Sequence, residues 1–375
     1  MNGTRVGVGA GVGAGANLGV LRGHNAALVL DLLRGAGTAG LSRLELAERT
    51  GLTPQAVSKI TARLRADGFV AEAGRRASTG GKPRTVLRLV PEAAYAVGAH
   101  LDRDELRVVL ADLTGAVVAE RRAALDLGAG AGVVLDGVVR EAGALLAEVR
   151  AVDGGGTVLG LGVALPGPLD HVRGVLHRVT GFPEWDGFPL REALAGRLGM
   201  EVVVDKDTNA AALGIAVAGA HRSFAYLHLG TGLGAGLVLD GTVHRGERTG
   251  AGEFGHQVVQ LDGPLCGCGD RGCVEALCLE AVDRGSVDEA ARVLGVGAAN
   301  LVGLLDIDVV LLGGRTVEAE PERFLRGVEA VLEERGRRTG EGAVPVGLAL
   351  GETDGGVAKG AAWLLLGPVF GRGRG

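Results

Sequence analysis

The sequence predicts an α/β protein in two parts: a small helical head with a β-hairpin, and a larger body of two α/β lobes. Two observations carry this prediction. Apolar residues recur at helical spacing through three short segments between residues 23 and 66. After Pro91 the pattern changes, and the order of three strands, helix, strand and helix occurs twice. Such a repeat favours two similar lobes with a cleft between them.

The head is expected to span residues 21–91 and to follow a flexible, glycine-rich arm at residues 1–20. Its first helix is predicted over residues 23–36. Ser42 and Glu45 form a capping-box pattern that begins the second helix.

Thr53 and Pro54 begin the third helix as N-cap and first helical residue. Two short strands, Phe69–Val70 and Val86–Val90, are predicted on either side of the polar loop GRRASTGGKPRT. Together these elements form a winged helix-turn-helix, whose third helix can lie in the major groove of DNA. An ordinary three-helix bundle with a polar loop is the alternative.

Charge supports nucleic-acid binding by the head. Residues 1–90 carry 13 basic and 5 acidic side chains, whereas the rest of the chain carries 26 basic and 39 acidic ones. The residues expected to contact DNA are polar or basic side chains on the exposed face of the third helix and on the wing, namely Gln55, Ser58, Lys59, Arg63, Arg75, Arg76, Lys82 and Arg84.

The body is expected to span residues 92–368, with lobes at about 92–207 and 208–368. Its predicted strands are 95–101, 107–112, 117–122, 158–165, 202–205, 224–230, 236–239, 308–312 and 344–350. Its predicted helices are 132–150, 208–219, 322–337 and 354–366. No apolar run is long enough to cross a membrane, and the glycine-rich start of the chain is not expected to act as a signal peptide.

Four candidate metal ligands follow the pattern His-x9-Cys-x-Cys-x4-Cys, namely His256, Cys266, Cys268 and Cys273. Thiolate and imidazole groups suit Zn²⁺, and four such ligands describe a closed structural site. Reduced, buried cysteines without a metal are the alternative. Three cysteines within eight positions also favour a reducing compartment over a disulfide framework, so a cytoplasmic protein is expected.

Five motifs resemble those of the ROK family, which groups bacterial repressors, uncharacterised reading frames and sugar kinases: GTGLGAGLVLDG (230–241), AGEFGH (251–256), CGCGDRGCVE (266–275), DKDTNAAALG (205–214) and VVLLGG (309–314). The resemblance covers about residues 20–366, including the winged helix found in the repressor branch. It implies that the body has the two-lobed, actin/hexokinase-like (ribonuclease H-like) fold of the family.

The resemblance also implies the roles of four cleft residues. Asp207 matches the family's catalytic base, which takes a proton from the sugar hydroxyl that attacks the γ-phosphate. Glu253, His256 and Glu275 match residues that bind sugar hydroxyls. His256 would then both ligate zinc and contact the sugar.

The sequence departs from the family pattern where phosphate should bind. Active members resemble Asp-x-Gly-Gly-Thr-Lys between the first two strands of the body, whereas this chain has His-Leu-Asp-Arg-Asp-Glu at 100–105. Both glycines are absent, and Asp102, Asp104 and Glu105 should repel phosphate. ATP is therefore not expected to bind, and Asp207 is expected to be vestigial as a catalyst.

Three further departures concern the sugar site and its surroundings. Lys206 stands where the family usually has Asn, and Gly181 stands where another Asn usually contacts sugar. The region between Leu279 and Asn300 is shorter than in typical members, which puts the helical cover of the second lobe in doubt.

These features predict a non-catalytic transcription regulator, a repressor controlled by a sugar or sugar derivative. The expected partners are double-stranded operator DNA, a sugar effector and further copies of the chain in a homodimer or homotetramer. An active ATP-dependent sugar kinase with a DNA-binding arm is one alternative. A ligand-independent transcription regulator is the other.

Overall fold

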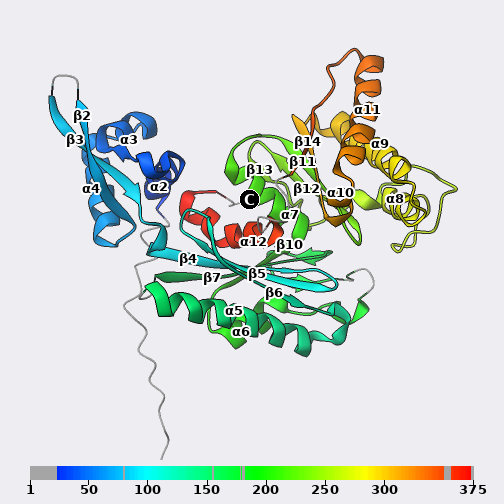
Figure 1. The fold of residues 1–375 in the computed structure, drawn as a ribbon, viewed down its shortest axis with the longest axis horizontal. Coiled ribbons are helices and arrows are strands. Elements are labelled where there is room, and N and C mark those ends of the chain that lie inside the picture. The colour runs from blue at the N-terminus through cyan, green and yellow to red at the C-terminus, as the bar shows by residue number, and fades with distance from the viewer. Residues whose placement is uncertain are drawn as a thin grey trace, which may run out of the picture.

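A computed structural model of the chain describes residues 23–78, 81–153, 156–177, 179, 182–349 and 356–372 (Figure 1). Within these ranges the side chains of residues 75–78, 81–83 and 149–153 are not described. The predicted N-terminal arm at residues 1–20 and Gly181 lie outside the described residues.

The head contains the predicted helices and a small sheet. The helices are α2 (His24–Ala36), α3 (Arg43–Thr50) and α4 (Pro54–Ala66), with the 3-10 turn η1 (Gly37–Ala39) between the first two. The sheet has the order β1-β3-β2 and is built from β1 (Leu41–Ser42), β2 (Val70–Ser78) and β3 (Gly81–Leu89).

The predicted helix starts in the head are confirmed. The Ser42 backbone N–H donates to Glu45 Oε2 at 2.8 Å, and the Glu45 N–H donates to Ser42 Oγ at 3.3 Å, which completes the capping box. The Thr53 side chain accepts from the Ala56 N–H at 3.2 Å, and Pro54 opens α4. Local sequence therefore decides where these two helices begin.

The prediction of a wing loop between two short strands is wrong in its boundaries. Most of GRRASTGGKPRT belongs to the long hairpin of β2 and β3, which pair from Val70–Leu89 out to Ser78–Gly81. A register shift between Glu72 and Gly74 interrupts the pairing. The polar composition of this segment does not require a loop, because the strand pairing itself satisfies the backbone hydrogen bonds.

The first lobe is a five-stranded sheet of order β10-β7-β4-β5-β6. Its strands are β4 (Ala94–Leu101), β5 (Glu105–Asp112), β6 (Val117–Ala124), β7 (Thr157–Leu165) and β10 (Val202–Lys206). Helices α5 (Ala131–Asp153) and α6 (Leu190–Leu198) cover one face (Figure 1). The short elements are η2 (Pro91–Ala93), η3 (Leu127–Ala129), β8 (Leu169–Asp170), β9 (Val175–Leu176) and η4 (Pro183–Trp185).

The second lobe repeats this plan with the order β13-β12-β11-β14-β15. Its strands are β11 (Phe224–Leu229), β12 (Leu233–Leu239), β13 (Thr242–Val243), β14 (Val309–Gly313) and β15 (Val346–Leu348). Its outer helices and turn are η5 (Phe254–His256), α8 (Val274–Asp283), α9 (Val287–Leu305), α10 (Arg315–Ala319) and α11 (Pro321–Thr339). Helix α9 packs against α11 and α8, so the shorter 279–300 region still supplies the helical cover that the sequence left in doubt.

Each lobe therefore has three antiparallel strands extended by two parallel ones, which confirms the predicted repeat. Two inner helices, α7 (Asp207–Ala218) and α12 (Gly356–Leu366), lie between the lobes and pack against one another. Helix α12 also packs on β4 and β7 of the first lobe, although it follows the second lobe in sequence. Figure 1 shows α12 at the centre of the molecule.

The head docks onto the end of α12. Asp31 of α2 accepts hydrogen bonds from Arg372 at 2.8 and 3.0 Å and from Arg34 at 3.0 and 3.2 Å. The Arg34 guanidinium also lies over the rings of Trp363 and Phe370, at 5.4 and 5.6 Å from their centroids. The head core continues without a break through η7 (Gly367–Phe370) into α12 and α7, so head and body share one hydrophobic cluster.

None of the helices among the described residues combines the length and the apolar character that crossing a membrane requires.

The contact between α12 and the first sheet gives a testable prediction. A Cβ on Gly98 of β4 would lie 2.0 Å from the Ala358 carbonyl oxygen and 2.6 Å from the Ala362 nitrogen. Gly98→Ala should therefore lower the free energy of unfolding by about 1–3 kcal/mol, because backbone cannot move aside cheaply. Chemical denaturation measures this change.

The matched control is Gly143→Ala on α5, where a Cβ would meet nothing within 4 Å. That exchange should be neutral or stabilising by up to about 1 kcal/mol, since alanine is the better helix former. Equal effects of the two substitutions would contradict the packing argument.

Candidate functional site

The surface of the head that the sequence predicts to contact DNA is formed by helix α4. Val57 and Leu64 are buried in the head core, and Ile60 packs against it. The opposite side is exposed and carries the predicted contact residues Gln55, Ser58, Lys59 and Arg63. On the wing Arg84 is exposed, whereas the side chains of Arg75, Arg76 and Lys82 lie outside the described ones. The arrangement provides a polar and basic helix face, as major-groove binding requires.

The predicted metal ligands come together at one point of the second lobe. One ligand atom from each of His256, Cys266, Cys268 and Cys273 lies within 4.8 Å of the other three. Cys268 Sγ is 3.8 Å from Cys273 Sγ, and Cys266 Sγ is 3.6 Å from His256 Nδ1. Tetrahedral zinc with Zn–S bonds of about 2.3 Å requires sulfur atoms about 3.8 Å apart, so the donor set and the spacing both fit Zn²⁺.

The fold brings these ligands together through tight turns. The Gly272 and Gly269 backbones take φ angles of +66° and +103° in the loop that carries the cysteines, and a Cβ on Gly272 would lie 1.6 Å from the Gln260 carbonyl oxygen. The Val259 N–H donates to the Gly272 carbonyl at 2.9 Å, which ties this loop to the segment after His256. The fourth cysteine, Cys278, is buried in α8 and lies outside the cluster, as predicted.

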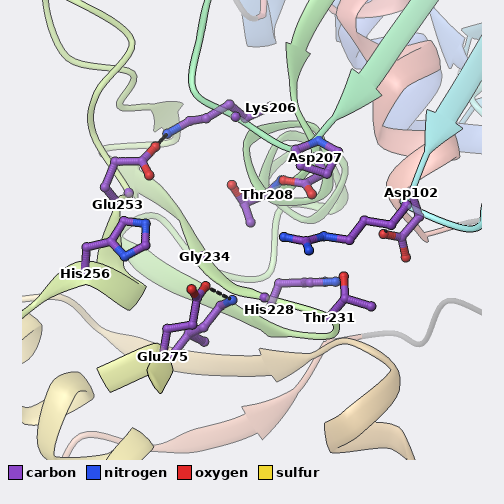
Figure 2. A pocket seen from close by; sticks show the side chains of 16 residues that line it. Asp102, Lys206, Asp207, Thr208, His228, Thr231, Gly234, Glu253, His256 and Glu275 are labelled. Atoms are coloured by element: carbon purple, nitrogen blue, oxygen red, sulfur yellow. Dashed lines mark hydrogen bonds and ion pairs between the residues drawn. The ribbon is translucent and has the colours of Figure 1, made fainter. Parts of the chain in front are cut away.

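A cleft between the lobes contains all four residues expected to bind ligand (Figure 2). Asp207 is the first residue of α7, and Glu275 lies in the first turn of α8. Glu253 directly precedes the turn η5, and His256 is its last residue. Figure 2 shows Glu253, His256 and Glu275 along one side of the pocket and Asp102 on the opposite side. Segments more than 170 residues apart in the chain thus meet at one site.

Each of the three carboxylates predicted to bind ligand has one hydrogen bond among the described residues. Asp207 Oδ1 accepts from the Thr208 N–H at 2.6 Å, and Glu275 Oε2 accepts from the Leu233 N–H at 2.7 Å. Glu253 Oε1 accepts from Lys206 Nζ at 3.0 Å. Among the described residues the second oxygen of each carboxylate makes no hydrogen bond, so each can accept one from a ligand hydroxyl.

Lys206 forms part of this site. Its side chain is only 4% exposed, and its ammonium group donates to the Ala251 carbonyl as well as to Glu253. The Lys206 stem fills space beside Gly167, where a Cβ would lie 2.8 Å from Lys206 Cδ. The lysine therefore neutralises one of three clustered carboxylates and leaves the site less negative than the carboxylates alone would make it.

The loop that replaces the family's first phosphate loop differs from the prediction. The sequence predicts that Asp102 and Asp104 bring negative charge that repels phosphate, but both carboxylates pair with Arg315 at the start of α10. Burial raises the pKa of Asp102, yet the charge of His100 and the bonds from Arg103 and Arg315 outweigh it and lower the pKa overall. Sequence reasoning missed Arg315, because it follows Asp104 by more than 200 residues.

The glycine-rich loop between the strands predicted at 224–230 and 236–239 is also shorter than predicted, and this glycine loop comprises residues 230–232. Strand β12 begins at Leu233, so Gly234 and Gly236 lie within a strand. A Cβ on Gly236 would lie 2.2 Å from the Thr208 carbonyl oxygen of α7. Close packing of α7 on the sheet accounts for Gly236 without any phosphate.

Comparison with known proteins identifies two segments of the chain. Residues 149–285 match the ROK family, and residues 29–71 match a winged helix-turn-helix DNA-binding family. Residues 149–285 are therefore a ROK family domain, and an N-terminal winged helix-turn-helix precedes it. The resemblance inferred from the motifs and the two-lobed fold expected from it are both confirmed.

ROK relatives include regulators and kinases. The xylose repressor of Caldicellulosiruptor bescii is 25% identical over 339 residues, which cover 79% of this chain and 84% of the repressor. The crystal structure of a ROK family transcriptional regulator, a homologue of the Escherichia coli MLC protein, has a TM-score of 0.76 at 20% identity and covers 94% of this chain and 98% of its own. The ROK hexokinase of Thermus thermophilus has a TM-score of 0.57 at 29% identity, covering 72% of this chain and 97% of its own.

The cluster of four candidate metal ligands gives a testable prediction. Burial raises the pKa of the Cys273 thiol to about 12, so binding Zn²⁺ there must release the proton. Cys266→Ser should lose the bound zinc and lower the melting temperature of the second lobe. Metal analysis and calorimetry of purified protein measure both effects. Cys278→Ala is the control and should keep one zinc per chain; full zinc content in Cys266→Ser would contradict the ligand assignment.

A second prediction concerns His100, which is buried at the end of β4. Burial lowers the pKa of His100 below 6.5, although the charges of Asp207 and Asp102 oppose this. Below pH 6.5 the unfolded chain therefore binds a proton that the folded one does not, so acid favours unfolding. The free energy of unfolding should fall between pH 7 and 5, by at most about 1.4 kcal/mol per pH unit for this group.

His100→Gln should flatten that decline, which denaturation at several pH values would measure. His24→Gln, at an exposed position in α2, is the control and should leave the slope unchanged. An unaltered slope in His100→Gln would contradict the assignment.

Proposed function

We propose that this protein is a sugar-responsive, DNA-binding transcriptional repressor that does not catalyse phosphoryl transfer. The observation that carries the proposal is the physical link between the two functional surfaces. Helix α4 presents a polar and basic face, and the head that carries it shares its core with α12. Helix α12 in turn packs between the lobes that form the cleft. The similarity to a xylose repressor over most of the chain supports the same function.

The ligand is a sugar or sugar derivative held by Asp207, Glu253, His256 and Glu275. The free carboxylate oxygens accept hydrogen bonds from its hydroxyls, and Lys206 offers an N–H to one of its oxygens. Zn²⁺ has a structural role: bound to His256 and the three cysteines, it fixes the wall of the cleft that carries His256.

Asp207 is a ligand-binding residue in this proposal and not a working base. The segment at 100–105 lacks both glycines of the family's first phosphate loop, and two of its acidic side chains, Asp102 and Asp104, pair with Arg315. No close backbone approach to phosphate is available there. ATP is therefore not part of the proposed mechanism.

Sugar binding changes the closure of the lobes, and α12 passes this change to the head through Asp31, Arg34 and Arg372. In a homodimer or homotetramer such a change alters the spacing of two heads, and hence their fit to a palindromic operator. The proposed place of action is the cytoplasm, where operator DNA is found.

The test is a titration of full-length protein onto DNA from its own upstream region, followed by fluorescence anisotropy. D-xylose, D-glucose and N-acetyl-D-glucosamine are added in turn. At least one sugar should change the affinity for DNA by about tenfold, the range of typical allosteric coupling. If DNA binds and no sugar changes its affinity, the protein is a ligand-independent regulator.

Two variants separate the functions. Glu253→Gln should remove the sugar response and keep DNA binding. Lys59→Ala with Arg63→Ala should weaken DNA binding and reduce its salt dependence, because two cationic contacts are lost. Arg284→Ala, an exposed residue of the second lobe, is the matched control and should change neither.

An active sugar kinase is the second candidate, since Asp207 lies in the cleft with a free oxygen and the hexokinase is similar over most of the body. Phosphorylation of any of the three sugars by Mg-ATP, abolished in Asp207→Ala, would favour it over the repressor without catalysis.

A further inference from the structure

The loop between β4 and β5 brings Asp102 and Arg103 to the cleft. Asp102 and Asp104 both contact Arg315, and Arg103 lies between them in the sequence. Arg103 and Asp104 form a tight turn, which the hydrogen bond from the Asp102 N–H to the Glu105 carbonyl closes at 2.9 Å, and the pairing of both aspartates with Arg315 holds this turn in place. The Leu127 N–H donates to the Arg103 carbonyl at 3.1 Å, which also holds its backbone.

Arg315 is a strong anchor for this loop. Its guanidinium contacts both oxygens of Asp104, at 2.9 and 3.1 Å, and one oxygen of Asp102. Two N–H groups on one planar cation set the orientation as well as the distance. Burial acts to raise the pKa of both aspartates. Hydrogen bonds and nearby positive charges, those of Arg315 among them, outweigh this and lower the pKa overall, so the pairs remain charged at neutral pH. The anchor joins the second lobe to the first.

The Arg103 guanidinium lies beside the residues proposed to bind sugar. It lies over the Phe182 ring, 5.6 Å from its centroid, which holds the side chain in place. Its Nη2 atom is 4.0 Å from the position of a Cβ on Gly232, and Glu275 Oε2 is 3.2 Å from the same point. Gly232 has no side chain, and this leaves room for both groups at the glycine loop.

Arg103 has hydrogen-bonding capacity that the protein does not use. An arginine offers five N–H donors. Among the described residues none accepts a hydrogen bond from the Arg103 side chain, although the residue is half-buried. The half-buried cation therefore faces the cleft with donors available to a ligand.

We propose that Arg103 is a further ligand-contacting residue that determines specificity, and that Arg315 is the positioning residue that holds it in the cleft. This inference rests on the proposed function. Arg103 occupies the side of the cleft where the family's glycines would admit phosphate, so the cleft takes one sugar rather than a sugar and a nucleotide. That sugar carries an oxygen acceptor, from a hydroxyl or a phosphate ester, that reaches the glycine loop and pairs with Arg103.

The test is calorimetric titration of full-length protein with the three sugars and with D-glucose 6-phosphate. Arg103→Ala should lower the affinity for the probe that wild type binds most tightly by about tenfold to a hundredfold, the range for a lost charged hydrogen bond. Arg103→Lys should retain part of the affinity, since it keeps the charge without the planar fork. If a sugar hydroxyl accepts from Arg103, a free sugar should bind most tightly. If a phosphate ester accepts from Arg103, D-glucose 6-phosphate should bind most tightly.

Arg315→Ala tests positioning. It should lower the affinity for the same probe. In the Arg103→Ala background it should cause no further loss of affinity, because Arg315 acts only through Arg103. A merely structural role would add its effect in both backgrounds. Arg323→Ala is the matched control, since Arg323 makes a bidentate pair with Asp288 at 2.9 Å within the second lobe.

The outcomes separate this inference from the proposed function. If wild type binds a probe and Arg103→Ala binds it equally, the Arg103 inference is wrong and the sugar-responsive function stands. Additive losses in the double variant would overturn the role of Arg315. If wild type binds none of the four probes, both the inference and the function it rests on fail.

Discussion

The two inner helices touch each other and both sheets at positions where only a hydrogen atom fits. A Cβ on Gly162 of β7 would lie 1.9 Å from the Ala361 carbonyl oxygen of α12, and one on Gly360 would lie 2.0 Å from the Ala210 carbonyl oxygen of α7. In the same way, the absence of a side chain at Gly236 allows α7 to pack closely on the second sheet. Because these contacts are backbone to backbone, the helices cannot shift without moving the sheets, and α12 connects the cleft with the head.

Ion pairs join the lobes on two sides of the cleft. On the sugar side, Lys206 reaches from β10 to Glu253, and the buried pair of Asp205 and Arg245 lies next to it with an N–O distance of 2.7 Å. On the side of the former phosphate loop, Arg315 holds the β4–β5 loop. Breaking a buried pair leaves an uncompensated charge, so closure of this cleft depends on side chains of the protein itself.

Local signals in the sequence were sufficient for much of the fold. The caps at Ser42 and Thr53 act within four residues, and the strand and helix periodicities of the body need no distant partner. The predicted boundaries of the wing were wrong for a related reason. Its polar residues are typical of a loop, but pairing between β2 and β3 satisfies the backbone hydrogen bonds of this segment. Helix α9 contains Gly295 and Gly297, which weaken its helical signal, yet both glycines allow close packing against neighbouring side chains.

The sequence by itself was sufficient to predict the head with its basic helix and the repeated α/β body. It also identified the four candidate metal ligands and the four candidate ligand-binding residues. These depend on residue type, short spacing and recognisable motifs. Only the tertiary structure decided that Asp102 and Asp104 pair with Arg315, that Lys206 bonds Glu253, and that Arg103 lines the cleft. These partners are tens to hundreds of residues apart or depend on the direction of one side chain. Charge compensation across a cleft is set by three-dimensional distance, which spacing along the chain does not encode.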